Sequence, residues 1–90
     1  MQRYVIERDL PGAGDLSSQQ LKEIAQTSNE VLRGMKDIQW EQSFVTGDRI
    51  YCVYLAANEQ LVRDHADRGG FPCNTVTRVT SVIDPLTGFA

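Results

Sequence analysis

Two strand-like runs separated by a short turn constrain the fold of this chain more than any other feature. They are IQWEQSFV, residues 38–45, and RIYCVYLA, residues 49–56, with Thr46-Gly47-Asp48 between them. Both runs are rich in aromatic and β-branched residues, and a short connection that contains glycine is typical of a β-hairpin. We expect the two runs to pair antiparallel, with Gly47 in the left-handed backbone conformation that such a turn needs.

Helical patterns flank this hairpin on both sides. Ser17 and Gln20 have the spacing of a capping box, and an apolar stripe at three- and four-residue steps then continues to about residue 35. The stripe consists of Leu21, Ile24, Ala25, Ser28, Val31, Leu32 and Met35. After the hairpin, Asn58 is a good N-cap for a second, shorter helix that ends at Gly69-Gly70. Its apolar side consists of Leu61, Val62, His65 and Ala66.

One further strand-like run lies near each end of the chain. Residues 3–9 stop at a cluster of proline and glycine, and residues 75–83 form the last run, whose apolar positions break the period of two and predict a bulge or a twist. The order strand, helix, strand, strand, helix, strand is the ferredoxin-like βαββαβ pattern. This is an α+β fold with an antiparallel sheet of strand order 4-1-3-2 and two helices on one face. We expect a single domain over residues 1–90, because the chain is too short for two cores.

The second face of this sheet must also be covered. Alternation along the strands leads us to assign Glu7, Cys52 and Tyr54 to the open face, together with either Gln42 or the pair Glu41 and Ser43. Such a mixed face is too apolar for water and too polar for an ordinary core. We therefore expect a homodimer, a dimeric α+β barrel with a pocket between the two sheets.

Charge and composition exclude several classes of partner. The net charge is −3, and the lysines and arginines are scattered, so no basic stripe is available for nucleic acid or for an anionic membrane. The N-terminal MQRYVIERDL is neither a signal sequence nor a membrane span. We expect a cytoplasmic protein in which Cys52 and Cys73 are reduced, and the strand order disfavours a disulfide between them.

The only histidine and the strand cysteine are the residues with the most chemical interest. His65 is either a metal ligand or a packed imidazole near a helix end, where its charge would be favourable. Cys52 is either a ligand or a small buried hydrophobic residue. The sequence contains no CxxC, HxxxH or HExxH motif. A metal site would therefore need carboxylates, thiolate, backbone carbonyls, waters or a partner chain, and Glu7 beside Cys52 on one face would suit a metal ion.

Three segments together resemble a known family. YVIERDLPG, WEQSFVTGDRIYCVYLA and HADRGGFPCNTVTRVTSVIDP are similar, from about Tyr4 to Pro85, to a family of small bacterial proteins whose best-known member is described as nickel-responsive and nickel-binding. The resemblance implies a dimeric ferredoxin-like fold and binding of nickel or another divalent metal ion. It makes Glu7, Cys52 and His65 the first candidates as metal ligands. Members often carry a histidine where this chain has Gln42, so one plausible ligand is replaced.

Two functions from different classes follow. The first is a small non-enzymatic protein that binds nickel or a similar divalent ion and acts in metal buffering or response. The alternative is a dimeric α+β-barrel enzyme, monooxygenase- or isomerase-like, that encloses a small organic substrate. Trp40, Phe44 and Tyr54 would then line the pocket, with Glu7 or His65 as acid or base. A dimeric interaction module without a small ligand is the third possibility.

Overall fold

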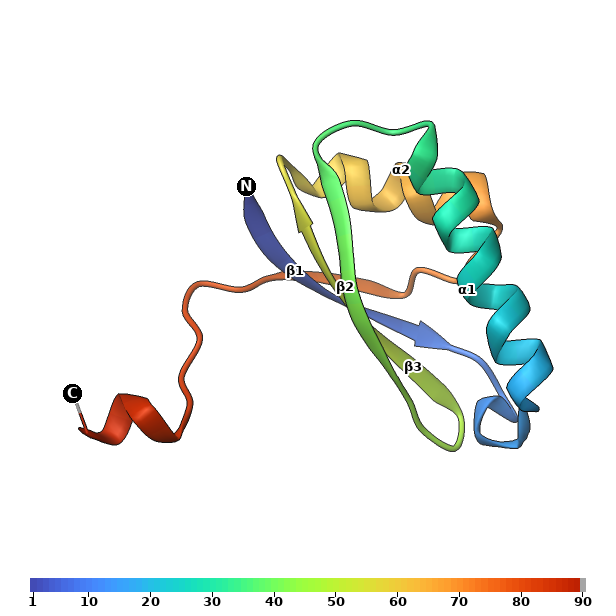
Figure 1. The fold of residues 1–90 in the computed structure, drawn as a ribbon, viewed down its shortest axis with the longest axis horizontal. Coiled ribbons are helices and arrows are strands. Elements are labelled where there is room, and N and C mark those ends of the chain that lie inside the picture. Colours follow the sequence, from blue (N-terminus) through green and yellow to red (C-terminus); the bar gives the residue numbers. More distant parts are fainter. Residues whose placement is uncertain (90) are drawn as a thin grey trace.

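The computed structural model describes residues 1–89, and this part of the chain contains four strands and two α-helices in the expected order (Figure 1). The elements are β1 (Gln2–Asp9), α1 (Ser18–Arg33), β2 (Ile38–Val45), β3 (Arg49–Ala56), α2 (Glu59–Gly69) and β4 (Thr75–Arg78). Two short 3-10 turns, η1 (Ala13–Asp15) and η2 (Pro85–Phe89), were not expected from the sequence. Neither described helix is long and apolar enough to cross a membrane.

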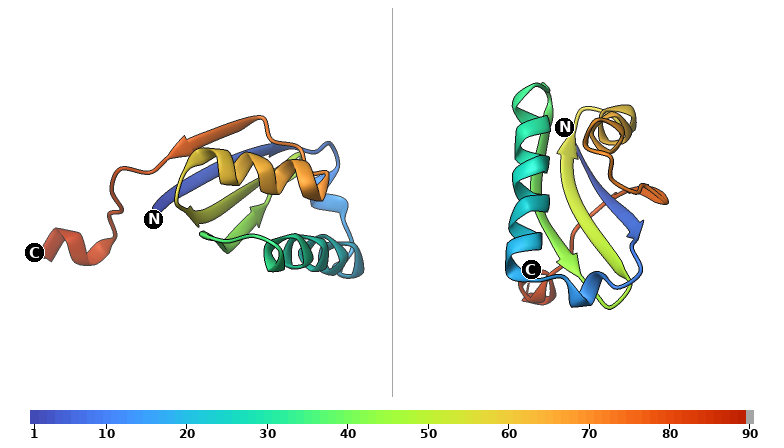
Figure 2. Two further views of the ribbon diagram at one scale, coloured as in Figure 1. Left: turned by 90° about the horizontal axis from the view of Figure 1, so that it is seen from above. Right: turned by 90° about the vertical axis from the view of Figure 1, so that its right-hand side faces the viewer.

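The sheet is antiparallel, with the strand order β2-β3-β1-β4, as predicted. Both helices lie on one of its faces (Figure 2). The central strands β1 and β3 pair in a register that sets Ile6 opposite Cys52 and Tyr4 opposite Tyr54. The expected α+β architecture is therefore confirmed, and the connectivity and strand order follow the ferredoxin-like pattern.

Local sequence signals explain where the helices begin and end. Ser17 and Gln20 form the predicted capping box at the start of α1. The Asn58 side chain accepts the backbone N–H of Leu61 at 3.0 Å and caps α2, and Gly70 ends that helix with φ 69°, a left-handed conformation that favours glycine. These caps satisfy backbone groups that a helix leaves without internal partners.

The prediction for the hairpin turn is wrong in one respect. Gly47 does not have a positive φ; instead, the turn closes where the Thr46 backbone N–H and hydroxyl both donate to the Arg49 carbonyl at 2.8 Å. The backbone of Gly14 also packs against this turn, donating to the Gly47 carbonyl at 2.9 Å. A Cβ at Gly14 would lie 3.0 Å from the Gly47 Cα, so the close approach requires a glycine there.

The last strand is shorter than predicted, and the irregularity lies elsewhere. β4 ends at Arg78. One residue later, the Val79 N–H still donates a hydrogen bond to the Arg3 carbonyl of β1, at 2.8 Å. Because β1 begins at Gln2, it offers no partner to residues 81–83. The chain then leaves the sheet and extends away from the body (Figure 1). The bulge is found in β2 instead, where the register shifts between Trp40 and Gln42.

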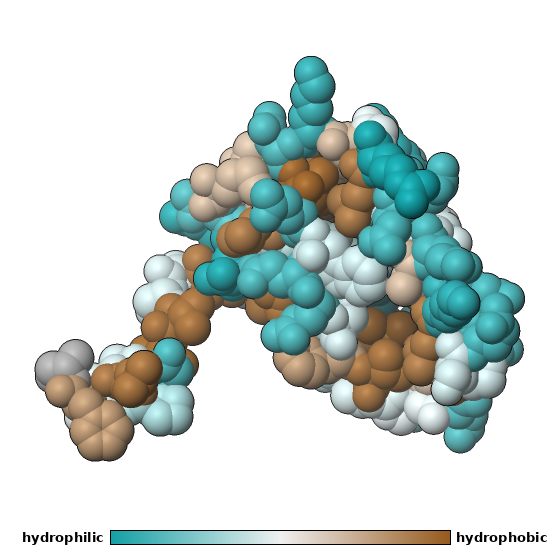
Figure 3. Space-filling view, in the orientation of Figure 1, coloured by the Kyte–Doolittle hydropathy of each residue, from teal (hydrophilic) through white to brown (hydrophobic). Residues whose placement is uncertain are grey.

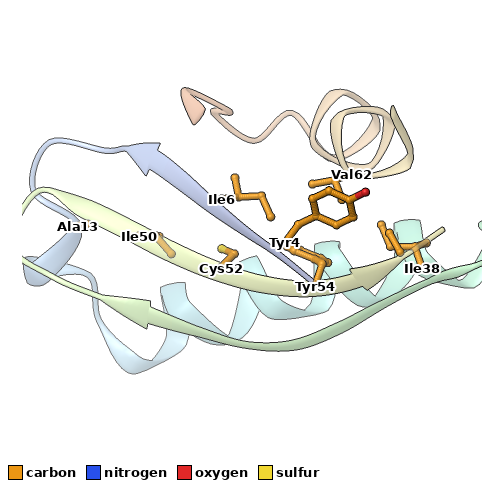
Figure 4. Packing of buried hydrophobic residues seen from close by; sticks show 9 residues of the cluster. Tyr4, Ile6, Ala13, Ile38, Ile50, Cys52, Tyr54 and Val62 are labelled. Carbon is orange, nitrogen blue, oxygen red and sulfur yellow. The ribbon is translucent and has the colours of Figure 1, made fainter. Parts of the chain in front are cut away.

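The hydrophobic core lies between the sheet and the helices (Figure 4). Its buried members are Tyr4, Ile6, Ala13, Ile38, Ile50, Cys52, Tyr54, Ala56 and Val62. Directly paired residues of an antiparallel sheet point to the same face, so Cys52 shares the inner, helix-covered face with Ile6. The assignment of Cys52 and Tyr54 to the open face with Glu7 is therefore wrong: Glu7 lies on the outer face, and the other two lie inside.

Candidate functional site

A cavity of about 390 Å³ lies between α1, the inner face of the sheet and the segment after α2. Helix α1 contributes apolar side chains to its wall, among them Leu21, Ile24 and Ala25. The predicted stripe of α1 does face inward, but only Ser28 of this helix is fully buried. Figure 3 shows hydrophobic surface between α1 and the hairpin end of the sheet, where these walls reach the exterior.

Arg8 supplies the charged group of this cavity. Its side chain is only 4% exposed, and Nε donates to the Cys52 Sγ at 3.3 Å. Nη1 donates to the Pro72 carbonyl at 2.5 Å, and Nη2 donates to the Tyr54 hydroxyl at 3.4 Å. The guanidinium carbon also lies 5.4 Å from the centre of the Phe71 ring. A guanidinium is thus fixed at the inner wall by a sulfur acceptor, two oxygen acceptors and an aromatic face.

The protonation of Arg8 and Tyr54 follows from their surroundings. Burial lowers the pKa of Arg8, but attraction to Cys52 and Tyr54 outweighs this effect, and the net pKa is above the usual value. Burial raises the pKa of Tyr54 more than the Arg8 charge lowers it. Arg8 is therefore a cation, and Tyr54 a neutral phenol, at physiological pH.

His65 is a packed core residue on α2. It is fully buried, and its Nε2 lies 3.1 Å from the Ser28 Oγ. Its ring is tilted against Tyr54 and Phe71, with centroids 5.2 and 5.7 Å away. Burial, and secondly the Arg8 charge, lower the pKa of His65 to about 4, so the imidazole is neutral. The presence of a histidine at this position is therefore explained by packing in the core and not by a favourable charge at the helix end.

The structure does not bring the three predicted metal ligands together. Cys52 and His65 lie on the inner side of the sheet, but Glu7 lies on the outer face, where it accepts hydrogen bonds from Arg49 Nη1 at 3.3 Å and from the Thr75 hydroxyl at 3.0 Å. Within residues 1–89, no three His, Cys, Asp or Glu side chains cluster closely enough to hold a metal ion.

A single interior nickel site made of Glu7, Cys52 and His65 therefore does not suit one chain, and the guanidinium beside Cys52 would also repel a divalent cation. That each of the three binds metal stays a prediction. Cys73 is half-buried, and both cysteines are free thiols.

The bulge in β2 brings Ser43 to the same inner face as Trp40. Because of the extra residue, Trp40 pairs with Tyr54 while Ser43 pairs with Cys52, so both point inward. The indole Nε1 donates to the Ser43 hydroxyl at 2.9 Å. Of the three aromatic residues expected to line a pocket, Trp40 and Tyr54 line this cavity. Phe44 is not among the lining residues and is 54% exposed.

The fold and the cavity together define a small α+β domain with ferredoxin-like connectivity. Residues 4–79 match the model of the family described as nickel responsive protein SCO4226-like, and the chain belongs to this family. The resemblance found in the sequence is thereby confirmed.

A solved structure supports the same fold. The crystal structure of SCO4226 from Streptomyces coelicolor A3(2) superposes with a TM-score of 0.77, covering 90% of this chain and 99% of that chain at 18% sequence identity. No curated protein matches the sequence significantly.

Proposed function

We propose that this protein is a cytoplasmic, non-enzymatic protein that binds nickel or a similar divalent ion and acts in metal buffering or response. The observation that carries the proposal is the family match over residues 4–79. The similar fold of SCO4226 is consistent with it. The arrangement of donors in this chain then determines which surface we choose for the metal.

The outer face of the sheet is the better surface for nickel. Glu7 lies there on central strand β1, with its side chain 34% exposed. Gln42 pairs with Val53, whose neighbours Cys52 and Tyr54 point inward, so Gln42 also faces outward. The position where the resembled family often carries a histidine is therefore on the same face as Glu7. Imidazole and carboxylate donors together suit nickel, and the repelling charge of buried Arg8 lies on the opposite face. A metal ion at Glu7 would have to displace the ion pair of Glu7 with Arg49, whose Nη1 lies 3.3 Å away but whose side chain is 43% exposed and can move.

We further propose that a second copy of the chain covers this outer face. Both described helices lie on the other face of the sheet (Figure 2), yet four apolar or aromatic side chains of the outer face are only half-buried: Val5, Tyr51, Val53 and Leu55. The segment after β4 also extends away from the body (Figure 1) and exposes apolar side chains. These are Val82, Ile83, Leu86 and Phe89, between 62% and 84% exposed. Apolar surface of this extent supports an interface, and a homodimer would supply metal donors in pairs.

Calorimetric titration of the metal-free protein with Ni(II) tests the proposal. We expect the Glu7→Gln variant to bind more weakly and the Gln42→His variant to bind more tightly. Each change should be about tenfold or more, because even changes outside the ligand shell shift metal affinity by about 10–100-fold. Gln26→His is the matched control, since residue 26 is exposed on the solvent side of α1.

The outcomes separate the possible sites. Equal affinity of the Gln42→His and Gln26→His variants would contradict an outer-face site. Weaker binding in the Cys52→Ser variant with no effect of Glu7→Gln would move the site to the interior. Absence of any binding stronger than that of a protein surface would remove the nickel proposal itself.

A further inference from the structure

The cavity beneath α1 has one polar end, and its remaining walls are largely apolar. Arg8, Ser28 and Tyr54 line the polar end, whereas Ile24 and Ile50 are among the apolar lining. Its volume of about 390 Å³ is at the lower end of the range for small-molecule sites, about 300–1,000 Å³. The space is therefore suited to a compact, mainly apolar molecule with a single polar group.

Arg8 retains hydrogen-bond donors that the protein does not use. A guanidinium has five N–H donors, and the contacts with Cys52, Pro72 and Tyr54 use three of them. No carboxylate of residues 1–89 forms a salt bridge with Arg8. A buried guanidinium without an anion is costly. The remaining N–H groups are free for an external anion, and a carboxylate matches their planar geometry.

Ser28 adds a second donor, and His65 determines its direction. The neutral His65 ring lies against Ser28 through Nε2, and its Nδ1 has no hydrogen-bond partner among residues 1–89. An unpaired buried N–H is rarer in proteins than an under-used acceptor, so we assign the proton to Nε2, which then donates to the Ser28 Oγ. The Ser28 hydroxyl is left to donate elsewhere: to the Tyr54 oxygen, a hydrogen bond that lowers the pKa of Tyr54 less than burial raises it, or to a molecule in the cavity that both residues line. His65 is thus a positioning residue.

Tyr54 supplies the third donor. Its hydroxyl accepts from Arg8 Nη2 at 3.4 Å, and its raised pKa keeps its own proton in place. Donors from β1, α1 and β3 thus line the same cavity, and no Asp or Glu is among the lining residues. Such a set of donors favours an anion over a cation or a neutral molecule.

We propose that this cavity binds a small organic acid, a monocarboxylate with a compact apolar body, whose carboxylate pairs with Arg8. The lining contains no lysine and no second arginine, so a single negative charge matches better than a doubly charged phosphate. This inference goes beyond the proposed nickel function. It does not depend on that function, because the outer face and the cavity lie on opposite sides of the sheet.

Binding of matched acids and amides to the metal-free protein tests the inference. The probes are phenylacetate and hexanoate, each compared with its uncharged amide. Trp40, the only tryptophan of the chain, lines the cavity and reports binding by fluorescence, and calorimetry gives the affinity. We expect each acid to bind about 10–100-fold more tightly than its amide, the range of a hydrogen bond to a charged group.

Three variants assign the effect to the cavity. In Arg8→Met the preference for the acid should disappear, whereas in Arg33→Met it should remain, because Arg33 is 73% exposed at the end of α1. Ala25→Leu partly fills the cavity and should weaken both acid and amide. If circular dichroism shows that Arg8→Met is unfolded, Arg8→Lys replaces it and should bind the acid about tenfold more weakly.

Three results would overturn the inference: no binding of either acid, equal binding of acid and amide, or acid binding that is unchanged in the folded Arg8 variant. Repeating the titration with Ni(II)-loaded protein keeps the two proposals apart. Acid binding without nickel binding, or the reverse, refutes one proposal and leaves the other standing.

Discussion

Arg8 Nε lies 3.3 Å from the Cys52 Sγ inside the fold, and this contact changes how both residues are understood. The thiol is an acceptor for a buried cation, which makes it a poor ligand for a second cation. No Asp or Glu among residues 1–89 forms a salt bridge with the guanidinium, so the carboxylate of a bound organic acid would be its first carboxylate partner.

Two substitutions of Arg8 separate the effect of its charge on stability from the effect of its volume. We expect Arg8→Met to change the free energy of unfolding by less than about 1 kcal/mol. Removal of the desolvated charge offsets the loss of donors to Pro72 and Tyr54. Arg8→Ala should cost about 2–4 kcal/mol, because it enlarges the cavity. Urea unfolding measures both values, and a loss of 3 kcal/mol or more in Arg8→Met would mean that the guanidinium is primarily structural.

The buried imidazole predicts a specific dependence of stability on pH. The pKa of His65 is about 4 in the folded protein and about 6.5 in the unfolded chain. Between these values the unfolded state binds more protons, so the free energy of unfolding falls as the pH falls from about 6.5 to 4. The loss attributable to His65 should reach about 3 kcal/mol.

Urea unfolding across this pH range, with His65→Gln as the control, measures that contribution. The variant cannot titrate at residue 65, so its stability should decrease less steeply with falling pH than that of the unchanged protein. NMR titration of the single histidine checks the cause directly. A folded-state midpoint near 6.5 would contradict the assignment of a buried neutral ring.

The ring of Phe71 leaves no room for a side chain at Gly69, the last residue of α2. A Cβ at Gly69 would lie 2.4 Å from the Phe71 ring, and this ring also contacts His65 and Arg8. Replacing a helical glycine by alanine usually gains about 1 kcal/mol. We expect Gly69→Ala instead to destabilise the protein by about 1–3 kcal/mol, the usual cost of overpacking.

A double-mutant cycle isolates the clash. In a Phe71→Ala background the ring is gone, and Gly69→Ala should then stabilise the protein by about 1 kcal/mol. Thermal unfolding of the four proteins gives the coupling energy. The same destabilisation in both backgrounds would show that the ring is not the cause.

The sequence predicted those parts of the fold that local signals determine. The strands at residues 38–45 and 49–56 have the predicted bounds, and the capping residues Ser17 and Asn58 act as expected. Alternation, however, shows only that two sets of side chains face opposite ways, and it does not show which set faces the helices. The bulge in β2 further shifts the phase, so that Trp40 and Ser43 share a face.

The cavity was harder to predict, because its central residue is of a type usually found on surfaces. Arginine in a strand is expected to be exposed, so its residue type does not indicate that Arg8 lies inside the fold. One signal was present: Arg8 is in phase with Tyr4 and Ile6, which are both buried. His65 was assigned to the correct face of α2, but its lowered pKa results first from burial and secondly from the charge of Arg8, which lies far away in the sequence.

The proposed homodimer predicts that a charge on the outer face will separate the subunits. Val53 lies near the middle of that face, between Val5 and Gln42 on the neighbouring strands. Sedimentation equilibrium should give the mass of two chains for the unchanged protein, and Val53→Lys should raise the dissociation constant about tenfold or more. Gln26→Lys adds the same charge on the solvent side of α1 and should leave the dimer intact.

The extended C-terminal segment provides a second, independent test of that interface. If its apolar side chains pack on the partner, Ile83→Asp should also weaken the dimer, because a buried carboxylate without a partner is costly. In a monomer the same change would have little effect, since Ile83 is 79% exposed. A dimer that is weakened by Val53→Lys but not by Ile83→Asp would restrict the interface to the sheet. A monomeric unchanged protein would rule out the barrel altogether.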